Sequence, residues 1–206
     1  MEIVLARHGE TEWSRDRRHT GRTDIPLTDN GRRQAGVLGD ALAGRSFARV
    51  LSSPLSRALD TCREAGLGEQ AELSGDLCEW DYGEYEGITT AEIRTRRADW
   101  NLWRDGCPGG ETAADVGRRV DRVLELLADL RGDAPGTTAR RGGDAAIFAH
   151  GHVLRVLAAR WLGLGPEAGA LFKLDTGTLS ALGYERETRV ITLWNAPVTA
   201  AGLPPR

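Results

Sequence analysis

Residues 4–11 read VLARHGET, and this stretch decides how the rest of the sequence is interpreted. The apolar run 3–6 predicts a buried strand that delivers a cation, Arg7, and an imidazole, His8, onto a glycine turn. In an open α/β sheet, ligands bind in the crevice beyond the carboxyl ends of the strands. The planar donor fork of an arginine matches phosphate oxygens, and a neutral imidazole beside it can attack phosphorus. The stretch therefore favours phosphate chemistry over a histidine that only ends a strand.

The same order of features returns far along the chain. Residues 145–149, AAIFA, predict a second buried strand, and His150 and Gly151 follow it directly. The helical spacing of 153–162 would set a helix N-terminus, with its free N–H groups, next to an anion. Two strands that each end in His-Gly indicate one shared site. His152 could stand behind that site as a donor, but a surface position near the helix start is favoured.

Residues 52–57, SSPLSR, supply a second candidate arginine. A serine N-cap with proline at the first helical position is a strong helix start. This predicts a helix that begins directly after a strand at 49–51 and holds Arg57 in its first turn, facing the strand ends. The alternative is an ordinary solvated helix arginine.

A candidate proton donor, Glu79, lies among large apolar side chains in the stretch 77–83, LCEWDYG. Partial burial raises the pKa of a carboxyl group, which suits a group that must donate a proton near neutral pH. Glu79 could equally be a structural hydrogen-bond acceptor. Spacing alone does not select it over three acidic neighbours, Asp81, Glu84 and Glu86.

Taken together, these segments resemble the histidine phosphatase superfamily, also called the phosphoglycerate mutase-like family. The resemblance runs from residues 7–11 to His150-Gly151 and includes 20–28, 53–58 and 77–87, in the family's order and spacing. It implies a three-layer α/β fold, with a mostly parallel central sheet covered by helices on both faces. We expect one domain over the whole chain, residues 1–206.

The resemblance also implies a role for each candidate catalytic residue. His8 would be the nucleophile that becomes phosphorylated, and Glu79 would protonate the leaving alcohol and later take a proton from water. Three residues would hold the phosphoryl oxygens: Arg7, Arg57 and His150. No cofactor or metal is implied, and no His, Cys and Asp cluster in the sequence has metal-ligand spacing.

Four further residues are candidates for substrate binding: Ser14, Thr20, Gly21 and Gly151. Ser14 stands where the family often has asparagine. A subgroup with sugar-bisphosphate phosphatases and broad acid phosphatases shares this serine and a segment like 100–107. Thr20 and Gly21 match the family's substrate loop, and Gly151 follows the second histidine.

The stretch 98–111 is expected to form a wall over the pocket, with Arg104 as a candidate for a second phosphate of a sugar substrate. Trp100 and Trp103 could instead simply pack a helix against the core. The arginines at 15, 17 and 18 could draw in an anion, although a solvated loop is the commoner fate of such a cluster.

The predicted function is hydrolysis of a small phosphorylated metabolite, a sugar phosphate, with a bell-shaped, acid-to-neutral rate profile. The alternatives are a cofactor-dependent phosphoglycerate mutase and a non-catalytic phosphate-binding module. The mutases resemble longer chains with an insertion after the proton-donor segment. Binding modules of this kind typically lose the nucleophile or the proton donor, and both are present here.

Composition fits such an enzyme. A net charge of −3 over 206 residues and a pI near 5.9 argue against general affinity for nucleic acids or membranes. No apolar run approaches the about 20 residues of a membrane span, and Arg7 interrupts the only apolar start, so no signal peptide is expected. Three cysteines without a CxxC pair favour a reducing compartment, the cytoplasm. A homodimer is compatible with the sequence.

Elsewhere the chain alternates predicted strands and helices. Helices are expected at 28–43 and 112–130, and strands at 2–6, 49–51, 145–149, 178–185 and 189–194, the last two as a hairpin around 186–188. Residues 132–144 predict a mobile surface loop, and 196–206 predict a tail.

Overall fold

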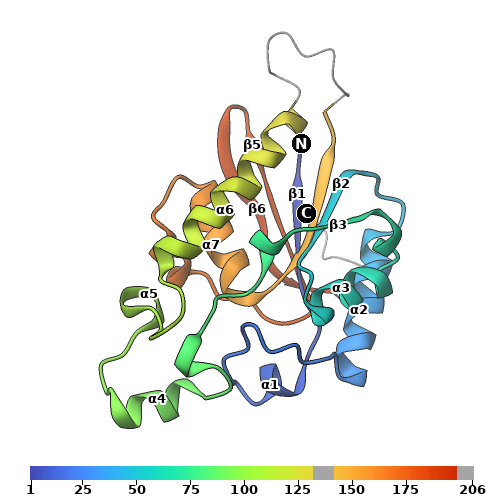
Figure 1. Ribbon diagram of the computed structural model, residues 1–206. Helices are drawn as coiled ribbons and strands as arrows, with labels where there is room; N and C mark the ends of the chain where they lie inside the picture. The colour runs from blue at the N-terminus through green and yellow to red at the C-terminus, as the bar shows by residue number, and fades with distance from the viewer. Residues whose placement is uncertain (132–141, 199–206) are drawn as a thin grey trace.

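The computed structural model describes residues 1–131 and 142–198, and its framework is a six-stranded sheet in the order β3-β2-β4-β1-β5-β6 (Figure 1). The strands are β1 (Ile3–Arg7), β2 (Phe47–Ser52), β3 (Ala71–Leu73), β4 (Asp144–Ala149), β5 (Thr178–Glu185) and β6 (Thr188–Pro197). The first four are parallel to one another, whereas β5 runs antiparallel to β1 and β6 antiparallel to β5. The predicted α/β fold with a mostly parallel sheet is confirmed.

Helices cover both faces of this sheet (Figure 1). One layer contains α6 (Ala113–Ala128) and α7 (Gly151–Trp161), and the other contains α2 (Asp29–Leu42) and α3 (Ser56–Glu64). Side chains along β1 alternate between the two cores: Ile3 and Leu5 pack toward α6 and α7, and Val4 and Ala6 toward α2 and α3. Because both faces are buried, the strand reads as a continuous apolar run.

The carboxyl ends of β1, β2 and β4 lie side by side in the sheet, since β4 sits between the other two. The His8 N–H donates to the carbonyl of Ala149, and the Ser53 N–H to that of Phe148, both at 3.0 Å. Three short helices extend beyond this edge: α1 (Glu12–Arg15), α4 (Thr90–Arg96) and α5 (Leu102–Asp105). Short 3-10 helices lie at Gly68–Gln70, Gly75–Leu77, Gly83–Tyr85, Asp129–Arg131 and Pro166–Leu171.

Local signals predicted most element positions. Thr28 caps α2 and Thr112 caps α6, each accepting a backbone N–H, and the β5–β6 hairpin turns at Arg186 with φ +55°. The predicted start of α3 is wrong. That helix begins at Ser56, with Leu55 as an N-cap that makes no side-chain bond, because Ser52 is still part of β2.

The predicted loop and tail are each too long. Asp144 already begins β4, where it takes part in the parallel pairing with β2. Ala196 and Pro197 still belong to β6, paired with Leu179 and Thr178. The remainder of these two predictions, residues 132–141 and 199–206, lies outside the described residues. No helix in the described part of the chain is long and apolar enough to cross a membrane.

Candidate active site

His8 stands one residue beyond β1 and is only 4 % exposed. Its Nδ1 lies 2.7 Å from the carbonyl oxygen of Gly9. A carbonyl can only accept, so this contact assigns the ring proton to Nδ1 and leaves a free lone pair on Nε2. Burial, followed by the charges of Arg57 and Arg7, holds the pKa of His8 well below its usual value. His8 is therefore a neutral imidazole with an available nitrogen, the state that a nucleophile requires.

Arg7 lies at the end of the same strand, against the first turn of α7. Its Nη1 donates to the carbonyl of Leu174, but its buried Nε has no hydrogen-bond partner in the described part of the chain. A Cβ atom added to Gly151 would lie 3.2 Å from the guanidinium carbon, so glycine allows the helix to start this close. An unpaired buried donor beside a helix N-terminus is an arrangement suited to an incoming anion.

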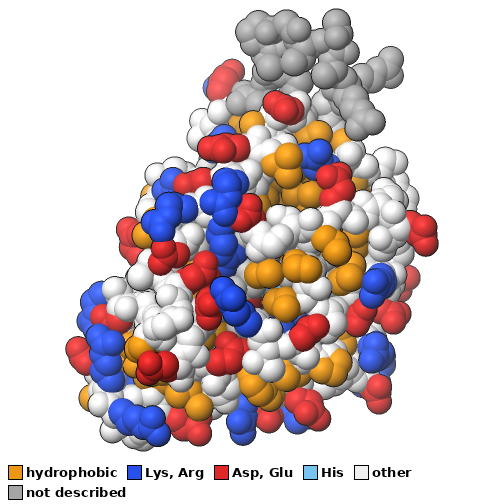
Figure 2. Space-filling model, viewed as in Figure 1, with side chains coloured by type: hydrophobic (Ala, Val, Ile, Leu, Met, Phe, Trp, Pro, Cys, Tyr) orange, Lys and Arg blue, Asp and Glu red, His pale blue; other side chains and the backbone are white. Residues whose placement is uncertain are grey.

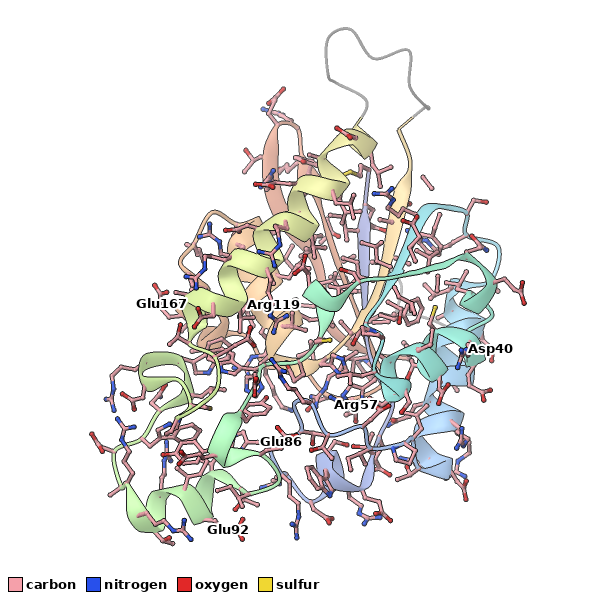
Figure 3. The ribbon with its side chains drawn as sticks, in the orientation of Figure 1. Asp40, Arg57, Glu86, Glu92, Arg119 and Glu167 are labelled. Carbon is pink, nitrogen blue, oxygen red and sulfur yellow. The ribbon has the colours of Figure 1, made fainter. Side chains whose placement is uncertain are left out.

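Arg57 and His150 are fully buried and bonded to each other. The Arg57 Nε–H donates to Nδ1 of His150 at 3.1 Å, so the other ring nitrogen carries the proton and donates to the hydroxyl of Ser53 at 2.8 Å. The His150 ring centroid lies 5.1 Å from that of His8. Arg57 points from the start of α3 toward the strand ends (Figure 3), which excludes a solvated surface position.

The guanidinium of Arg57 also holds the loop at 20–23. Its two Nη atoms donate to the carbonyls of Thr20, Gly21 and Thr23 at 2.9 to 3.1 Å. The Gly21 N–H donates to the Glu86 carboxylate at 2.9 Å. Gly21 therefore shapes the loop through its backbone, whereas Thr20 lines the adjacent cavity.

The carboxylate of Glu79 is held by three backbone N–H groups, those of Trp80 at 3.0 Å and of His152 and Val153, both at 2.9 Å. Burial raises the pKa of Glu79, but the hydrogen bonds from His152 and from the backbone at the start of α7 outweigh it and hold this pKa well below its usual value. The prediction of a raised pKa for Glu79 is wrong, because the start of α7 stabilises the charged form by more than burial disfavours it.

His152 is not the surface residue that was favoured from the sequence. Its Nδ1 lies 2.7 Å from the Tyr82 hydroxyl and 3.7 Å from Oε2 of Glu79, and its side chain is 24 % exposed. The rings of Trp80 and Trp103 pack around it. His152 thus forms part of the wall beside Glu79. The sequence feature that could have identified His152 as a site residue is its position in the first helical turn, directly after His150 and Gly151.

Arg7, His8, Glu79 and His152 open into a cavity of about 420 Å³, whereas the fully buried Arg57 and His150 do not line it. The floor of the cavity contains Arg7, His8, Glu79 and Tyr82, and the half-buried His152 lies in its wall. Trp100 and Trp103 line the cavity and also pack into the core, so both sequence interpretations of this pair hold. In residues 1–131 and 142–198, no three His, Cys, Asp or Glu side chains converge as a metal ion would require.

The structure does not bring every predicted substrate residue to the cavity. Arg104 lies outside it, with its guanidinium bonded to Asp105 and Asp99, so the prediction that it faces a second phosphate is wrong. On the single turn of α5, Trp103 faces inward and the next residue faces solvent. Ser14 does line the cavity, but its hydroxyl donates to the Thr11 carbonyl at 2.9 Å within a capping box.

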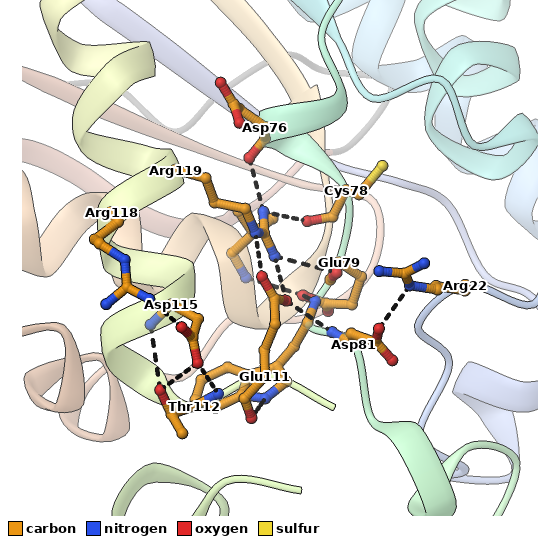
Figure 4. Close-up of polar contacts among 12 residues, drawn as sticks. Arg22, Asp76, Cys78, Glu79, Asp81, Glu111, Thr112, Asp115, Arg118 and Arg119 are labelled. Carbon is orange, nitrogen blue, oxygen red and sulfur yellow. Dashed lines mark hydrogen bonds and ion pairs between the residues drawn. The ribbon is translucent and has the colours of Figure 1, made fainter. Parts of the chain in front are cut away.

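Sequence reasoning missed Arg119, which fixes the segment that carries Glu79 (Figure 4). From α6, this nearly buried side chain donates to the carbonyls of Asp76, Cys78 and Glu79. It also forms a two-point ion pair with Glu111, at 2.9 and 3.1 Å. One arginine therefore satisfies three carbonyls and one carboxylate behind the site.

We expect Arg119→Met to lower the free energy of unfolding by about 3–5 kcal/mol, because a charge and three carbonyls lose their partner. Urea unfolding curves measure this difference. The matched control is Arg118→Met, since Arg118 lies on the same helix but is 67 % exposed in an ion pair with Asp115. The free energy of unfolding of Arg118→Met should stay within about 1 kcal/mol of the parent. Equal losses in the two variants would contradict the role given to Arg119.

Together these groups define an α/β protein that can hold a phosphate beside a nucleophilic imidazole. The sequence pattern of the histidine phosphatase superfamily (branch 1) matches residues 3–197. The chain is 38 % identical to an acid phosphatase of Mycobacterium tuberculosis, over 93 % of this chain and 90 % of that one. It is 36 % identical to sedoheptulose 1,7-bisphosphatase of Saccharomyces cerevisiae, over 79 % of this chain and 68 % of that one.

A solved structure supports the same assignment. The product of open reading frame Rv3214 from Mycobacterium tuberculosis superposes with a TM-score of 0.86 and 37 % identity, over 97 % of this chain and 98 % of that chain. The chain therefore belongs to the histidine phosphatase superfamily, and it is a phosphoric monoester hydrolase.

Proposed function

We propose that this protein hydrolyses a sugar phosphate through a phosphohistidine formed on His8. The observation that carries the proposal is the contact between Nδ1 of His8 and the Gly9 carbonyl, which leaves Nε2 unprotonated beside two arginines. The acid phosphatase and sugar-bisphosphatase relatives support the substrate class. Three free cysteines, Cys62, Cys78 and Cys107, support a reducing compartment, and we assign the enzyme to the cytoplasm.

In the first step, Nε2 of His8 attacks phosphorus as the ester P–O bond breaks in line with it. Arg7, through its unpaired Nε–H, stabilises the oxygens of the transferring group. Arg57 contributes a nearby positive charge, which also lowers the pKa of His8, and His150 positions Arg57 by accepting its Nε–H. The leaving oxygen takes a proton from Glu79.

The proton for that step enters with the substrate, because Glu79 is ionised in the empty site. A phosphate ester that binds as the monoanion can pass its proton to Glu79, whose pKa rises next to a second negative charge. In the second step water attacks phosphorus, Glu79 takes the proton of that water, and the P–N bond breaks. His8 then returns to its neutral form.

A rapid-quench experiment with a ³²P-labelled sugar phosphate tests the intermediate. We expect label on the protein that is stable to alkali and lost in acid, as a phosphohistidine requires, and no such label on His8→Ala. Turnover without any labelled protein under single-turnover conditions would contradict the proposal. Phosphoglycerate isomerisation that needs a bisphosphorylated primer would favour the mutase alternative.

The rate should be highest on the acid side of neutrality. Because its pKa is lowered well below 6.5, His8 stays neutral as the pH falls past that value. The substrate monoanion disappears above its own pKa of about 6. We therefore expect kcat/KM to fall about tenfold per pH unit above about pH 7. Initial rates in a constant-ionic-strength buffer series measure the profile.

Activity that falls on the acid side with a midpoint at 6.5 or above would show an ordinary histidine and contradict this assignment. Stability must be followed in parallel. Below pH 6.5, His8 and His150 become protonated in the unfolded chain but stay neutral in the folded protein, where their pKa values are lowered. Their contribution to the free energy of unfolding is therefore largest above that pH and decreases as the pH falls. Unfolding curves at each pH separate this loss from the chemistry.

A further inference from the structure

The cavity has a second group of cations, which lies on its exposed side. Its lining contains four arginines, Arg7, Arg17, Arg18 and Arg94, and a single carboxylate, Glu79. Arg7 and Glu79 belong to the reaction described above. The other three are exposed, so they form the rim of the cavity and not its base. The proposed hydrolysis of one phosphate group assigns no role to these three arginines.

The backbone brings these rim residues together from two segments. A β-bridge pairs Arg18 with Thr89, which joins the loop after α1 to the start of α4. Thr90 and Arg94 are four residues apart on α4, and both line the cavity, so one face of this helix is turned toward it. Arg17 adopts φ +59°, a left-handed conformation that is uncommon for a non-glycine residue and that concentrates at functional sites.

The rim arginines also lack the acidic partners that other arginines have. Ion pairs such as Arg63–Asp60, Arg122–Asp76 and Arg15–Asp16 are frequent on the surface, and Figure 2 shows basic and acidic side chains interspersed over one face. Within the described residues, no carboxylate lies within 4 Å of Arg17, Arg18 or Arg94. This concentrates positive potential at the rim of a protein whose net charge is −3.

Their hydrogen bonds leave donors free. In the described part of the chain, the guanidinium of Arg17 has no partner. Arg94 uses Nε and Nη2 on the Trp100 carbonyl, both at 3.2 Å, and Nη1 stays free. Arg18 donates from Nη1 to the Gly87 carbonyl at 3.2 Å. All three rim arginines therefore keep planar donors that are available to an anion. Arg17 keeps all of its donors, and Arg94 faces the cavity from the other of the two segments, so these two side chains are suited to hold one anion between them.

We propose that Arg17 and Arg94 form a second anion subsite, which binds a phosphate or carboxylate at the far end of the substrate from the transferred phosphate. This deepens the proposed function and rests on it. A cavity of about 420 Å³ has room for a small molecule that carries both groups. The substrate class is thus a bis-anionic phosphate ester, and the subsite replaces the one that the sequence assigned to Arg104.

The test compares substrates that differ in the second anion. One pair is fructose 1,6-bisphosphate and fructose 1-phosphate, and the other is 3-phosphoglycerate and glycerol 3-phosphate. The parent should prefer the bis-anionic member of one pair, which identifies phosphate or carboxylate as the ligand. In the double variant Arg17→Asn, Arg94→Gln, the ratio of kcat/KM within that pair should fall by about tenfold or more. Asparagine tolerates the left-handed backbone at position 17.

Arg96→Gln is the matched control, since Arg96 lies on α4 but does not line the cavity. In Arg96→Gln, the ratio of kcat/KM between the two members of the pair should stay within about twofold of the parent value. Absence of a preference in the parent for either pair, or an equal loss for both members in the double variant, would overturn the subsite.

Failure of the proposed function gives a different result, which is no turnover of any of the four compounds by the parent. The subsite is then tested by calorimetric titration with fructose 1,6-bisphosphate. Binding that is weaker by about tenfold or more in the double variant supports the subsite, and equal binding overturns it.

Discussion

Replacement of His8 by alanine is expected to lower kcat for phosphomonoester hydrolysis by about 10⁴-fold or more, the scale of loss when an enzyme loses its nucleophile. The reason is that the other imidazoles are engaged elsewhere. His19 lies against the rings of Tyr82 and Trp100, with its Nδ1 at the Ile88 carbonyl. His150 is buried with both ring nitrogens bonded to protein groups, and His152 is bonded to Tyr82. Phosphate release from p-nitrophenyl phosphate in the presence of a chelator measures the loss.

The control for this experiment is Arg104→Ala. Arg104 lies outside the cavity in surface ion pairs, so its removal should change kcat by no more than about twofold. Circular dichroism of both variants checks the fold. Residual turnover in His8→Ala within about tenfold of the parent would mean that water attacks directly, and the phosphohistidine would be abandoned.

Glu79→Gln should lower kcat for a sugar phosphate by about 10²–10⁴-fold, because the leaving alkoxide and the attacking water both lose their proton partner. Nitrophenolate leaves without protonation. The loss for p-nitrophenyl phosphate should therefore be smaller, confined to the hydrolysis of the intermediate. The comparison of the two substrates in steady-state and burst kinetics separates a chemical role from a general defect.

Glu84→Gln is the matched control, since Glu84 is an exposed carboxylate five residues further along the chain. It should keep kcat within about twofold for both substrates. An identical loss for the two substrates in Glu79→Gln would indicate a disturbed start of α7, where Glu79 holds two backbone N–H groups, and not a proton donor.

Of the described elements, five of the six strands and the four longest helices, α2, α3, α6 and α7, were predictable because their signals are local, whereas β3, α1, α4 and α5 were not predicted. The apolar run before Arg7 and the threonine caps at Thr28 and Thr112 need only neighbouring residues to act. The start of α3 was not, because Ser52 stays in β2 and the hydroxyl of Ser53 bonds to His150, 97 residues further along the chain. Local propensity predicts that a serine caps the helix, but in the folded protein the Ser53 hydroxyl accepts a hydrogen bond from His150.

The sequence by itself determined that Arg7 ends one buried strand and His8 follows it, and that His150 and Gly151 follow another, because a local apolar run sets each strand. Only the tertiary structure decided that Glu79 is ionised, that Arg104 faces solvent and that Arg17 and Arg94 face one cavity. The physical reason is that ionisation and partner choice depend on distant groups. Glu79 meets the helix start about 73 residues away, and Arg119 holds its backbone from 40 residues away.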